Sequence, residues 1–514
     1  MIQARRCGRC CPTVEQELRL DGHTPLLAMA AFIDDSGALS LLGLAAVRIV
    51  VFRLVSSQVP RPYMDEIFHV PQAQHYCMGS FSQWDPKITT FPGLYLIAAS
   101  LSPAFRLMNY MGGAADDSPF DSVVCSTGQL RSVNAYVLGP LCDLLVFCIL
   151  SRTYVVKGGS VALRLIRVAL FPPHWFYQLL FYTDTAATAT LLLAYYLYLS
   201  DRPRLSGLAG SVAVMCRQTN VVWVAGMAGL IAWDALTDEE RRALPMSLLR
   251  RGNGGEGEGW PLCRVLHRVW LHAAVCAAFL AFVVFVNEGS IVVGDRSHHR
   301  PVLHWAQLPY LYAYLVCFLL PPVVCAAAGE MIMVKKEGGK KEIPVRTTEA
   351  SKDATRVLVS VKRALFACTV FLVCYLCVHH GTCIHPFLLA DNRHFVFYLW
   401  RRLLQKPLVR LYALPLSLSV TSLFSASIFP SSCRLIECMC FAACCVLTLV
   451  PAQLLELRYF MVPAMLVLMH QRPLGMWGEA GGVVMHAALC AALVGVFAYL
   501  PFVWGDGTEA RFML

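Results

Sequence analysis

The 514-residue sequence contains few charged side chains. Asp, Glu, Lys and Arg make up 15% of it and hydrophobic residues 57%, whereas soluble domains carry about 25% charged residues. Apolar runs that are long enough, or nearly long enough, to span a bilayer recur between Leu39 and Val503. These features exclude a soluble globular protein and predict an integral membrane protein.

The apolar runs also lack the alternation of polar and apolar residues that marks the strands of a membrane β-barrel. Because lipid otherwise tolerates only helices, we expect an all-α polytopic bundle of about 12–14 transmembrane helices. The expected spans are 39–55, 132–150, 161–180, 186–199, 205–233, 269–286, 308–328, 364–378, 408–428, 438–454, 460–469 and 483–503.

Several motifs of soluble enzymes are missing. The sequence contains no Asp-x-Asp, which excludes the metal clamp typical of soluble nucleotide-sugar transferases. It also contains no P-loop, no G-x-S-x-G and no H-E-x-x-H. We therefore expect no metal and no other cofactor.

The net charge of +10 lies largely in short basic blocks between the apolar runs. Such blocks mark cytosolic loops under the positive-inside rule, so nucleic-acid binding is not expected. The predicted organisation is a cytosolic N-terminal tail at 1–38 and one polytopic transmembrane domain at 39–514. Within that domain we expect a first lumenal loop at 57–130 and cytosolic loops at 234–268 and 335–363.

Charge leaves two stretches of the topology ambiguous. If 92–108 spans the bilayer, the basic patch at 152–157 becomes lumenal, against the charge rule. If 92–108 instead lies along the interface, that patch is cytosolic, and we favour this alternative. The direction of the chain through 205–233 stays open.

The 22 cysteines lie mostly in apolar segments, where they are expected to be small buried hydrophobic residues. Cys7, Cys10 and Cys11 form a C-x-x-C-C motif without a second ligand pair, which argues against zinc. Lipidation of a cytosolic tail is an alternative for these three. The run at 26–33 is too short for a signal peptide, and 39–55 is expected to act as a signal anchor.

The densest polar cluster outside the basic loops lies at 62–93, directly after the first apolar run. It contains Asp65, Glu66, His69, Gln72, Gln74, His75, Trp84, Asp85 and Lys87. Acids, amides, an indole and an ammonium together are typical of a sugar-and-phosphate site. Transfer to a hydroxyl needs a carboxylate that takes its proton, and an adjacent acidic pair in an extended stretch would place the two carboxylates on opposite sides. The alternative is that both acids are solvated at a loop edge.

A second cluster, Asp391, Asn392, Arg393 and His394, lies between apolar flanks. Polar groups at membrane depth are costly and usually functional. The guanidinium of an arginine can bind two oxygens of one phosphate at the same time, so this cluster suits a phosphate. The alternative is that Arg393 and Asp391 form a structural ion pair. Smaller polar groups occur at 182–184, 217–220, 294–298 and 456–459.

Five of these blocks resemble one known family. They read Y-M-D-E-I-F-H-V-P-Q-A-Q at 63–74, F-S-Q-W-D-P-K-I-T-T at 81–90, R-Q-T-N at 217–220, H-P-F-L-L-A-D-N-R-H at 385–394 and R-Y-F at 458–460. The sequence is identified as similar to the endoplasmic-reticulum dolichyl-phosphate-glucose α-1,2-glucosyltransferases, from about Tyr63 to the R-F-M at 511–513. These enzymes add the third and last glucose to the lipid-linked N-glycan precursor.

The resemblance implies a GT-C-type bundle in the endoplasmic-reticulum membrane with its active site in lumenal loops. It implies dolichyl-phosphate glucose as donor and a diglucosylated Man9GlcNAc2-diphosphodolichol as acceptor. By this resemblance the catalytic acids are Asp65 first and Glu66 second, in an inverting single displacement without a metal.

The resemblance and the residue types together assign the remaining site residues. Donor phosphate or sugar contacts are expected from Arg393, His394, Asp391, Asn392, Arg458, Arg217 and Lys87. Acceptor or sugar contacts are expected from Tyr63, His69, Gln72, Trp84, Asp85, Asp184 and Asp295. Two alternatives remain, another dolichyl-phosphate-sugar transferase of the same class and a membrane transporter or scramblase.

Overall fold

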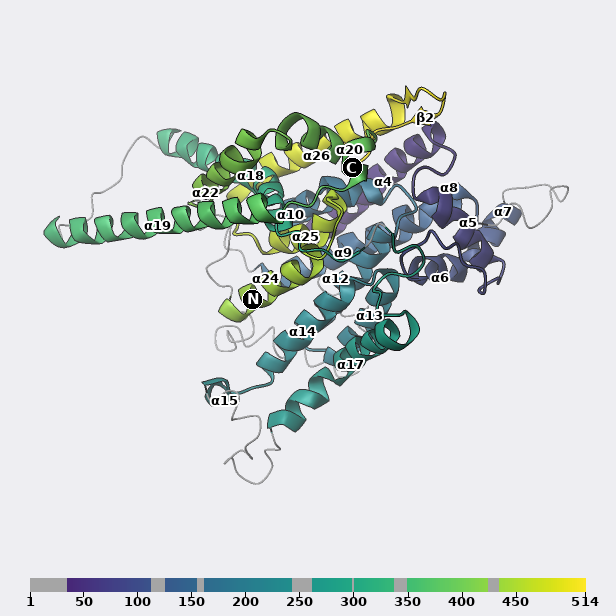
Figure 1. Cartoon of the computed structure of the whole chain (residues 1–514), viewed down its shortest axis with the longest axis horizontal. Helices are drawn as coiled ribbons and strands as arrows, with labels where there is room; N and C mark the ends of the chain where they lie inside the picture. The colour runs from purple at the N-terminus through teal and green to yellow at the C-terminus, as the bar shows by residue number, and fades with distance from the viewer. Residues whose placement is uncertain are drawn as a thin grey trace. The chain divides into compact units, whose positions relative to one another are not determined.

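Helices form almost all of the regular structure in the computed structural model (Figure 1). The structure describes residues 35–111, 125–154, 161–242, 261–297, 300–336, 349–423 and 434–514. Within these ranges the two strands, β1 (Phe502–Val503) and β2 (Glu509–Ala510), pair as one antiparallel hairpin. The predicted all-α membrane fold is therefore confirmed.

In the described ranges, six helices are long and apolar enough to cross a bilayer. They lie at Asp35–Gln58, Thr127–Thr153, Pro261–Val286, Gln307–Met331, Val361–Gly381 and Gly475–Tyr499. Shorter apolar helices cover Asn220–Asp234, Leu435–Leu449 and Leu457–His470. The protein is thus a multi-pass membrane protein. Fewer helices reach spanning length than the sequence predicts, because proline and polar residues divide several apolar runs.

The single span predicted at 161–180 is wrong. α10 (Val161–Ala169) and α11 (Pro172–Tyr177) form instead. Pro172 has no N–H, and its ring disfavours helical geometry at Phe171, so the chain turns between the two helices.

The run at 205–233 also forms two helices, α13 (Pro203–Cys216) and α14 (Asn220–Asp234). At 1.5 Å per residue each is only about 21–23 Å long, which is short of the roughly 30 Å hydrocarbon core. Asn220 donates its side-chain amide to the carbonyl of Ala213 at 2.9 Å. That bond satisfies a backbone group at the break, as an apolar environment requires.

The stretch 92–108, for which an interfacial position stays a prediction, forms two short helices. α6 (Gly93–Ser100) and α7 (Ser102–Met111) contain 8 and 10 residues. Neither helix is long enough to cross a bilayer.

Both expected cytosolic loops contain helix at their ends. α15 (Asp238–Arg242) and the start of α17 (Pro261–Ala281) fall within 234–268. α18 (Gln307–Lys336) and α19 (Glu349–Gly381) extend into 335–363. The cytosolic position of both loops stays a prediction. Most of the expected tail at 1–38, with Cys7, Cys10 and Cys11, lies outside the described residues.

The chain forms two compact units. Unit 1 comprises Met1–Thr153, Pro172–Arg300 and Arg434–Thr448, and unit 2 comprises Tyr154–Phe171, Pro301–Cys433 and Leu449–Leu514.

Unit 1 is built around α12 (Thr183–Leu199), which packs against α9 (Gly139–Thr153) and α13 (Figure 1). α17 packs against α13 and α14. The other helices of this unit are α6, α7, α11 and α15, together with α4 (Asp35–Gln58), α5 (Glu66–Cys77), α8 (Thr127–Ser132), the π-helical stretches η2 (Val133–Leu138) and η3 (Phe282–Val286), and α24 (Leu435–Leu449). Arg48 of α4 forms a buried ion pair with Asp143 of α9, which joins two apolar helices through charge.

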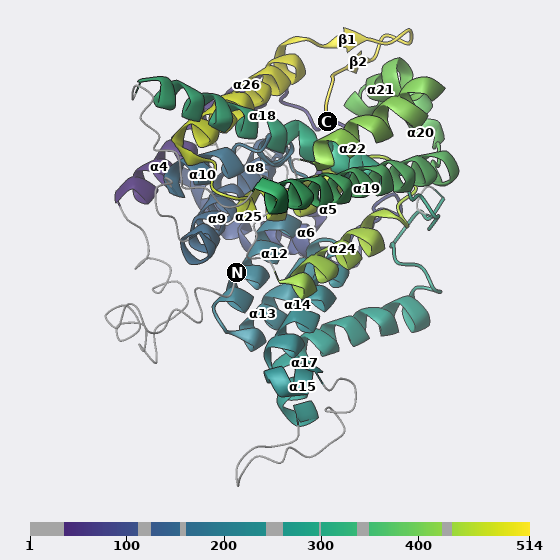
Figure 2. The same ribbon diagram turned by 90° about the vertical axis from the view of Figure 1, so that its left-hand side faces the viewer.

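Unit 2 pairs α18 with α26 (Gly475–Tyr499) and α19 with α22 (Leu414–Ser422) (Figure 2). Its shorter elements are α20 (Pro386–Ala390), α21 (Phe395–Leu399), η4 (Trp400–Leu404), η5 (Val409–Ala413), η6 (Leu457–Phe460) and α25 (Met461–His470). Arg164 of α10 binds Glu479 of α26 at 2.5 Å, and Arg167 binds the same carboxylate at 3.0 Å. All three side chains are fully buried.

The contact between α6 and α13 depends on Gly93. A Cβ at this position would lie 2.5 Å from the carbonyl oxygen of Met215 and 2.7 Å from the nitrogen of Cys216. We expect Gly93→Ala to destabilise the protein by about 1–3 kcal/mol, because backbone atoms cannot make room by changing rotamer.

The measurement is the midpoint of thermal unfolding in detergent. Gly43→Ala is the matched control, since a Cβ there meets nothing within 4 Å. An equal midpoint for both variants would contradict the close packing of α6 on α13.

Candidate functional site

Asp65 lies at the start of α5, where the chain leaves a strained turn. Met64 has a positive φ of 54°, a conformation that costs a residue with a side chain about 1–2 kcal/mol. Asp65 itself has helical angles (φ −62°, ψ −22°) and is half-buried. The extended conformation predicted for the acidic pair is therefore wrong, and the pair opens a helix.

Glu66 is fully buried and all four of its lone-pair positions accept hydrogen bonds. Oε1 accepts Nε of Arg131 at 2.8 Å and the backbone N–H of Phe181 at 2.7 Å. Oε2 accepts Nη2 of Arg131 at 2.6 Å and the backbone N–H of Tyr63 at 3.0 Å. The carboxylate thus joins the turn before α5, the helix α8 and the segment that leads to α12.

Tyrosines and a histidine surround Asp65. The hydroxyl of Tyr182 accepts the backbone N–H of Asp65 at 3.1 Å. Nδ1 of His69, one helical turn along α5, lies 2.5 Å from the hydroxyl of Tyr95. Burial raises the pKa of Tyr95, and the nearby carboxylates of Asp65 and Asp85 act in the same direction. The hydroxyl of Tyr95 is therefore neutral, and it lies near the carboxylates of Asp65 and Asp85.

The turn at 81–90 is fixed by Gln72. Its amide nitrogen donates to the carbonyl of Gln83 at 2.7 Å, and its amide oxygen accepts the backbone N–H of Asp85 at 2.9 Å. This turn places the indole of Trp84 6.0 Å from the ring of Tyr95. Lys87 is exposed and lies 5.1 Å over the ring of Phe68.

A second loop packs on this turn through main-chain bonds. Asp295 donates its N–H to the carbonyl of Pro86 at 2.7 Å. Gly294 has a φ of +68°, and a Cβ there would lie 2.3 Å from the same carbonyl oxygen. Only glycine fits this approach, which brings Asp295 beside the Trp84–Asp85 turn.

Asp184 and Arg217 form an ion pair at the break between α13 and α14. The Asp184 side chain is fully buried in the first turn of α12, whereas 19% of the Arg217 side chain is exposed. Gln218 donates its amide to the carbonyl of Thr89 at 2.8 Å. The polar break thus contacts the 81–90 turn.

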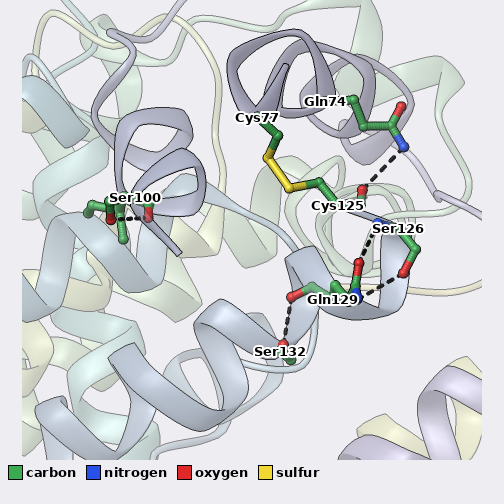
Figure 3. Close-up of a disulfide and its surroundings, with 8 residues drawn as sticks. Gln74, Cys77, Ser100, Cys125, Ser126, Gln129 and Ser132 are labelled. Atoms are coloured by element: carbon green, nitrogen blue, oxygen red, sulfur yellow. Dashed lines mark hydrogen bonds between the residues drawn. A yellow bond between two sulfur atoms is a disulfide. The ribbon is translucent and has the colours of Figure 1, made fainter. Parts of the chain in front are cut away.

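A disulfide between Cys77 and Cys125 joins the end of α5 to the residue before the cap of α8 (Figure 3). Gln74 donates its amide to the carbonyl of Cys125 at 3.2 Å. Ser126 and Gln129 form a reciprocal capping box at the start of α8 (Figure 3). The prediction that the cysteines are mostly buried hydrophobic residues does not include this bond.

In unit 2 the second cluster forms a compact polar turn between α20 and α21. Arg393 binds both oxygens of Asp391, at 2.8 and 2.7 Å. Burial acts to raise the pKa of Asp391, but hydrogen bonds from Arg393 and the charge of His394 outweigh it, so the pKa lies below its ordinary value. Asn392 accepts the indole N–H of Trp504 at 2.9 Å.

Arg458 lies in η6 and pairs with Glu456 two residues earlier. About one fifth of each side chain is exposed. The guanidinium lies 6.0 Å from the ring of Tyr459. Arg458 and Arg393 are thus both partly exposed cations that a nearby carboxylate holds in place.

The structure therefore distributes the predicted residues between the two units. Unit 1 contains Tyr63, Asp65, Glu66, His69, Gln72, Trp84, Asp85, Lys87, Asp184, Arg217 and Asp295, and unit 2 contains Asp391, Asn392, Arg393, His394 and Arg458. In the part of the chain that the structure describes, no group of three or more His, Cys, Asp or Glu side chains is placed to hold a metal ion.

Comparison with known proteins decides the family. A model described as the DIE2/ALG10 family matches residues 59–469. A protein of Rattus norvegicus named Dol-P-Glc:Glc(2)Man(9)GlcNAc(2)-PP-Dol alpha-1,2-glucosyltransferase is 33% identical over 443 residues, which cover 80% of this chain and 85% of the relative. The chain belongs to the DIE2/ALG10 family.

Other relatives with the same name agree with this membership of the DIE2/ALG10 family. The Homo sapiens protein is 33% identical over 442 residues, covering 80% of this chain and 85% of its own length. The Arabidopsis thaliana protein is 30% identical over 520 residues, covering 89% and 96%. No solved structure matches the chain. The DIE2/ALG10 match includes every site residue predicted from the sequence, whereas the hairpin at 502–510 lies beyond it.

Sequence reasoning missed Arg131, Tyr95 and Tyr182. Arg131 carried a signal, because a cation at the edge of an apolar run needs a partner. The two tyrosines carried no such signal, since only the fold brings them to Asp65.

Loss of Arg131 should be costly. Arg131→Gln leaves the buried Glu66 carboxylate without its charge partner, and we expect a loss of about 3–5 kcal/mol. Thermal unfolding in detergent measures the effect. Arg296→Gln is the control, since its ion pair with Glu288 is exposed and should contribute at most about 1 kcal/mol. Similar midpoints for the two variants would argue against a central role for the buried pair.

The disulfide is directly testable. In protein isolated from membranes with free thiols blocked, Cys77 and Cys125 should react with a second alkylating reagent only after reduction. Peptide mass spectrometry distinguishes the two labels. Cys490, which is free, is the internal control after unfolding in the first reagent. First-label modification of Cys77 would disprove the bond.

Proposed function

We propose that this protein transfers glucose from dolichyl-phosphate glucose to the terminal glucose of Glc2Man9GlcNAc2-diphosphodolichol, forming an α-1,2 bond. The family membership and the shared name of its relatives support the reaction. The observation that carries the mechanism is the contrast within the acidic pair, in which Glu66 is saturated with hydrogen bonds and Asp65 is half-buried beside tyrosine and histidine.

Asp65 is the general base of this proposal. It takes the proton of the acceptor's 2-hydroxyl as that oxygen attacks the anomeric carbon. The bond from the anomeric carbon to the phosphate oxygen breaks, and dolichyl phosphate leaves with the electron pair. Since the donor is β-linked and the product α-linked, a single displacement with inversion accounts for the stereochemistry.

Glu66 is a positioning residue in this mechanism. Its carboxylate has no acceptor position left for a substrate proton, because Arg131 and two backbone N–H groups occupy all four. Through Tyr63 and Phe181 it holds the two backbone segments on either side of Asp65. The base therefore has a fixed orientation before the substrate binds.

The acceptor sugar faces the aromatic side of unit 1 in this proposal. The indole N–H of Trp84 makes no hydrogen bond within the described part of the chain and is suited to a sugar hydroxyl. Tyr63, His69, Gln72, Asp85, Asp184 and Asp295 complete the proposed set of acceptor contacts.

The leaving phosphate is stabilised by cations rather than by a metal. Each unit by itself offers candidate contacts. They are Arg217 and Lys87 in unit 1, and Arg393, His394 and Arg458, with Asp391 and Asn392 in support, in unit 2. A single phosphate monoanion or dianion can be neutralised by guanidinium and imidazolium donors. Each such donor typically contributes on the order of 10²–10³ in rate.

The proposed location is the endoplasmic-reticulum membrane with a lumenal active site. The Cys77–Cys125 disulfide supports this, because it lies in the same loop as Asp65 and disulfides persist in the oxidising lumen but not in the cytosol.

The test is glucose transfer by the purified protein to a synthetic diglucosylated acceptor, with EDTA present throughout. Asp65→Asn should lower kcat by about 10²–10⁴, while its thermal midpoint and donor binding stay unchanged. Glu66→Gln should lower activity together with the thermal midpoint, since it disrupts a buried ion pair.

Three outcomes would contradict parts of the proposal. Full activity in Asp65→Asn would move the base to Asp85, which is tested by Asp85→Asn. Loss of wild-type transfer in EDTA that is restored by a divalent cation would exclude a metal-free reaction. Transfer of mannose from dolichyl-phosphate mannose at the same rate as glucose would exclude specificity for glucose.

A further inference from the structure

The segment 504–514 lies along the polar turn Asp391–His394 within unit 2. Met513 donates its backbone N–H to the carbonyl of Arg393 at 2.8 Å and accepts the N–H of Phe395 at 3.1 Å. Met513 and His394 thereby form a parallel β-bridge. The Met513 residue is 2% exposed, so these bonds are shielded from water.

Side chains join the same two segments. Trp504 donates its indole N–H to Oδ1 of Asn392 at 2.9 Å. The guanidinium of Arg393 lies 4.8 Å over the indole ring. This cation–π contact restrains the orientation of the guanidinium. Two consecutive residues of the proposed phosphate turn are therefore oriented by one tryptophan.

Segment 504–514 is itself fixed to the end of α26. Arg511 donates Nη1 to the carbonyls of Phe497 and Ala498 at 2.9 and 2.7 Å, which caps the last turn of that helix. The β1–β2 hairpin closes at Gly507, whose φ is +83°. A rigid helix and hairpin thus hold the position of both Trp504 and Met513.

The turn needs this support because the helix before it is short. α20 contains five residues, too few to fix the backbone that follows it. Backbone groups near lipid must also find protein partners. Met513 provides two such bonds, to Arg393 and Phe395 on either side of His394.

We propose that Trp504 and Met513 are positioning residues for donor binding, holding Asn392, Arg393 and His394 in the geometry that receives the donor phosphate. This inference rests on the proposed function, in which Arg393 contacts that phosphate. It adds a segment that lies beyond the residues matched by the family model.

The experiment compares Met513→Pro with Met513→Leu. Proline removes the N–H that binds Arg393, whereas leucine keeps both the N–H and nearly the same volume. Met513→Pro should raise KM for dolichyl-phosphate glucose about tenfold, the effect of losing one hydrogen bond. KM for the acceptor should stay within about twofold, and Met513→Leu should resemble wild type.

Trp504→Phe provides a second, milder variant. It keeps an aromatic ring under Arg393 and removes only the indole donor to Asn392. We expect KM for the donor to rise several-fold, by roughly the same hydrogen-bond effect, with no change in thermal midpoint.

Arg393→Gln, measured alongside, separates this inference from the proposed function. If Arg393→Gln raises donor KM while Met513→Pro and Trp504→Phe match wild type, the positioning role is overturned. If both variants instead lower the thermal midpoint and change donor and acceptor KM equally, their role is structural and the inference is also overturned. If Arg393→Gln leaves donor KM unchanged, the phosphate-site assignment itself fails, and the inference fails with it.

Discussion

The buried ion pair between Glu66 and Arg131 determines how the first polar loop of unit 1 is organised. Two charges in a buried site are stable only when nearly all of their hydrogen-bonding capacity is used. Glu66 meets this condition by accepting backbone N–H groups from Tyr63 and Phe181 as well as the guanidinium. Because those groups belong to segments far apart in the sequence, the pair fixes the local backbone on both sides of Asp65. The strained turn at Met64 persists because these bonds hold it.

The same principle recurs inside the apolar helices of each unit. Arg48 and Asp143 join α4 to α9 in unit 1, and Arg164, Arg167 and Glu479 join α10 to α26 in unit 2. In lipid, apolar side chains gain little by leaving one apolar surface for another, so polar contacts add specificity to helix packing. Each unit is therefore held together by charge at points where the sequence is otherwise uniformly hydrophobic.

Hydrophobic runs predicted the fold class because lipid restricts spanning segments to so few forms. Within the described residues they overestimated the number of long helices, since run length does not show where a Pro172 or an R-Q-T-N motif divides the helix. The acidic pair and the 81–90 turn were recognisable as one site because they are close in sequence. The roles within the pair were not, because they depend on contacts to Arg131, Phe181 and Tyr182, which distant segments supply. The bond between Cys77 and Cys125 was equally hidden among 22 cysteines.

That disulfide has a consequence for how the protein can be produced. Cys77 and Cys125 are 48 residues apart, and closing a loop of that size removes roughly 4 kcal/mol of unfolded-chain entropy in a simple polymer treatment. The bond also lies between the helix that begins at Asp65 and the capped start of the next long span. A host that synthesises the chain without an oxidising compartment can still make the helices, but it cannot covalently fix α5 to α8. Expression systems with a secretory pathway are therefore suited to this protein, because their oxidising compartment allows the disulfide to form.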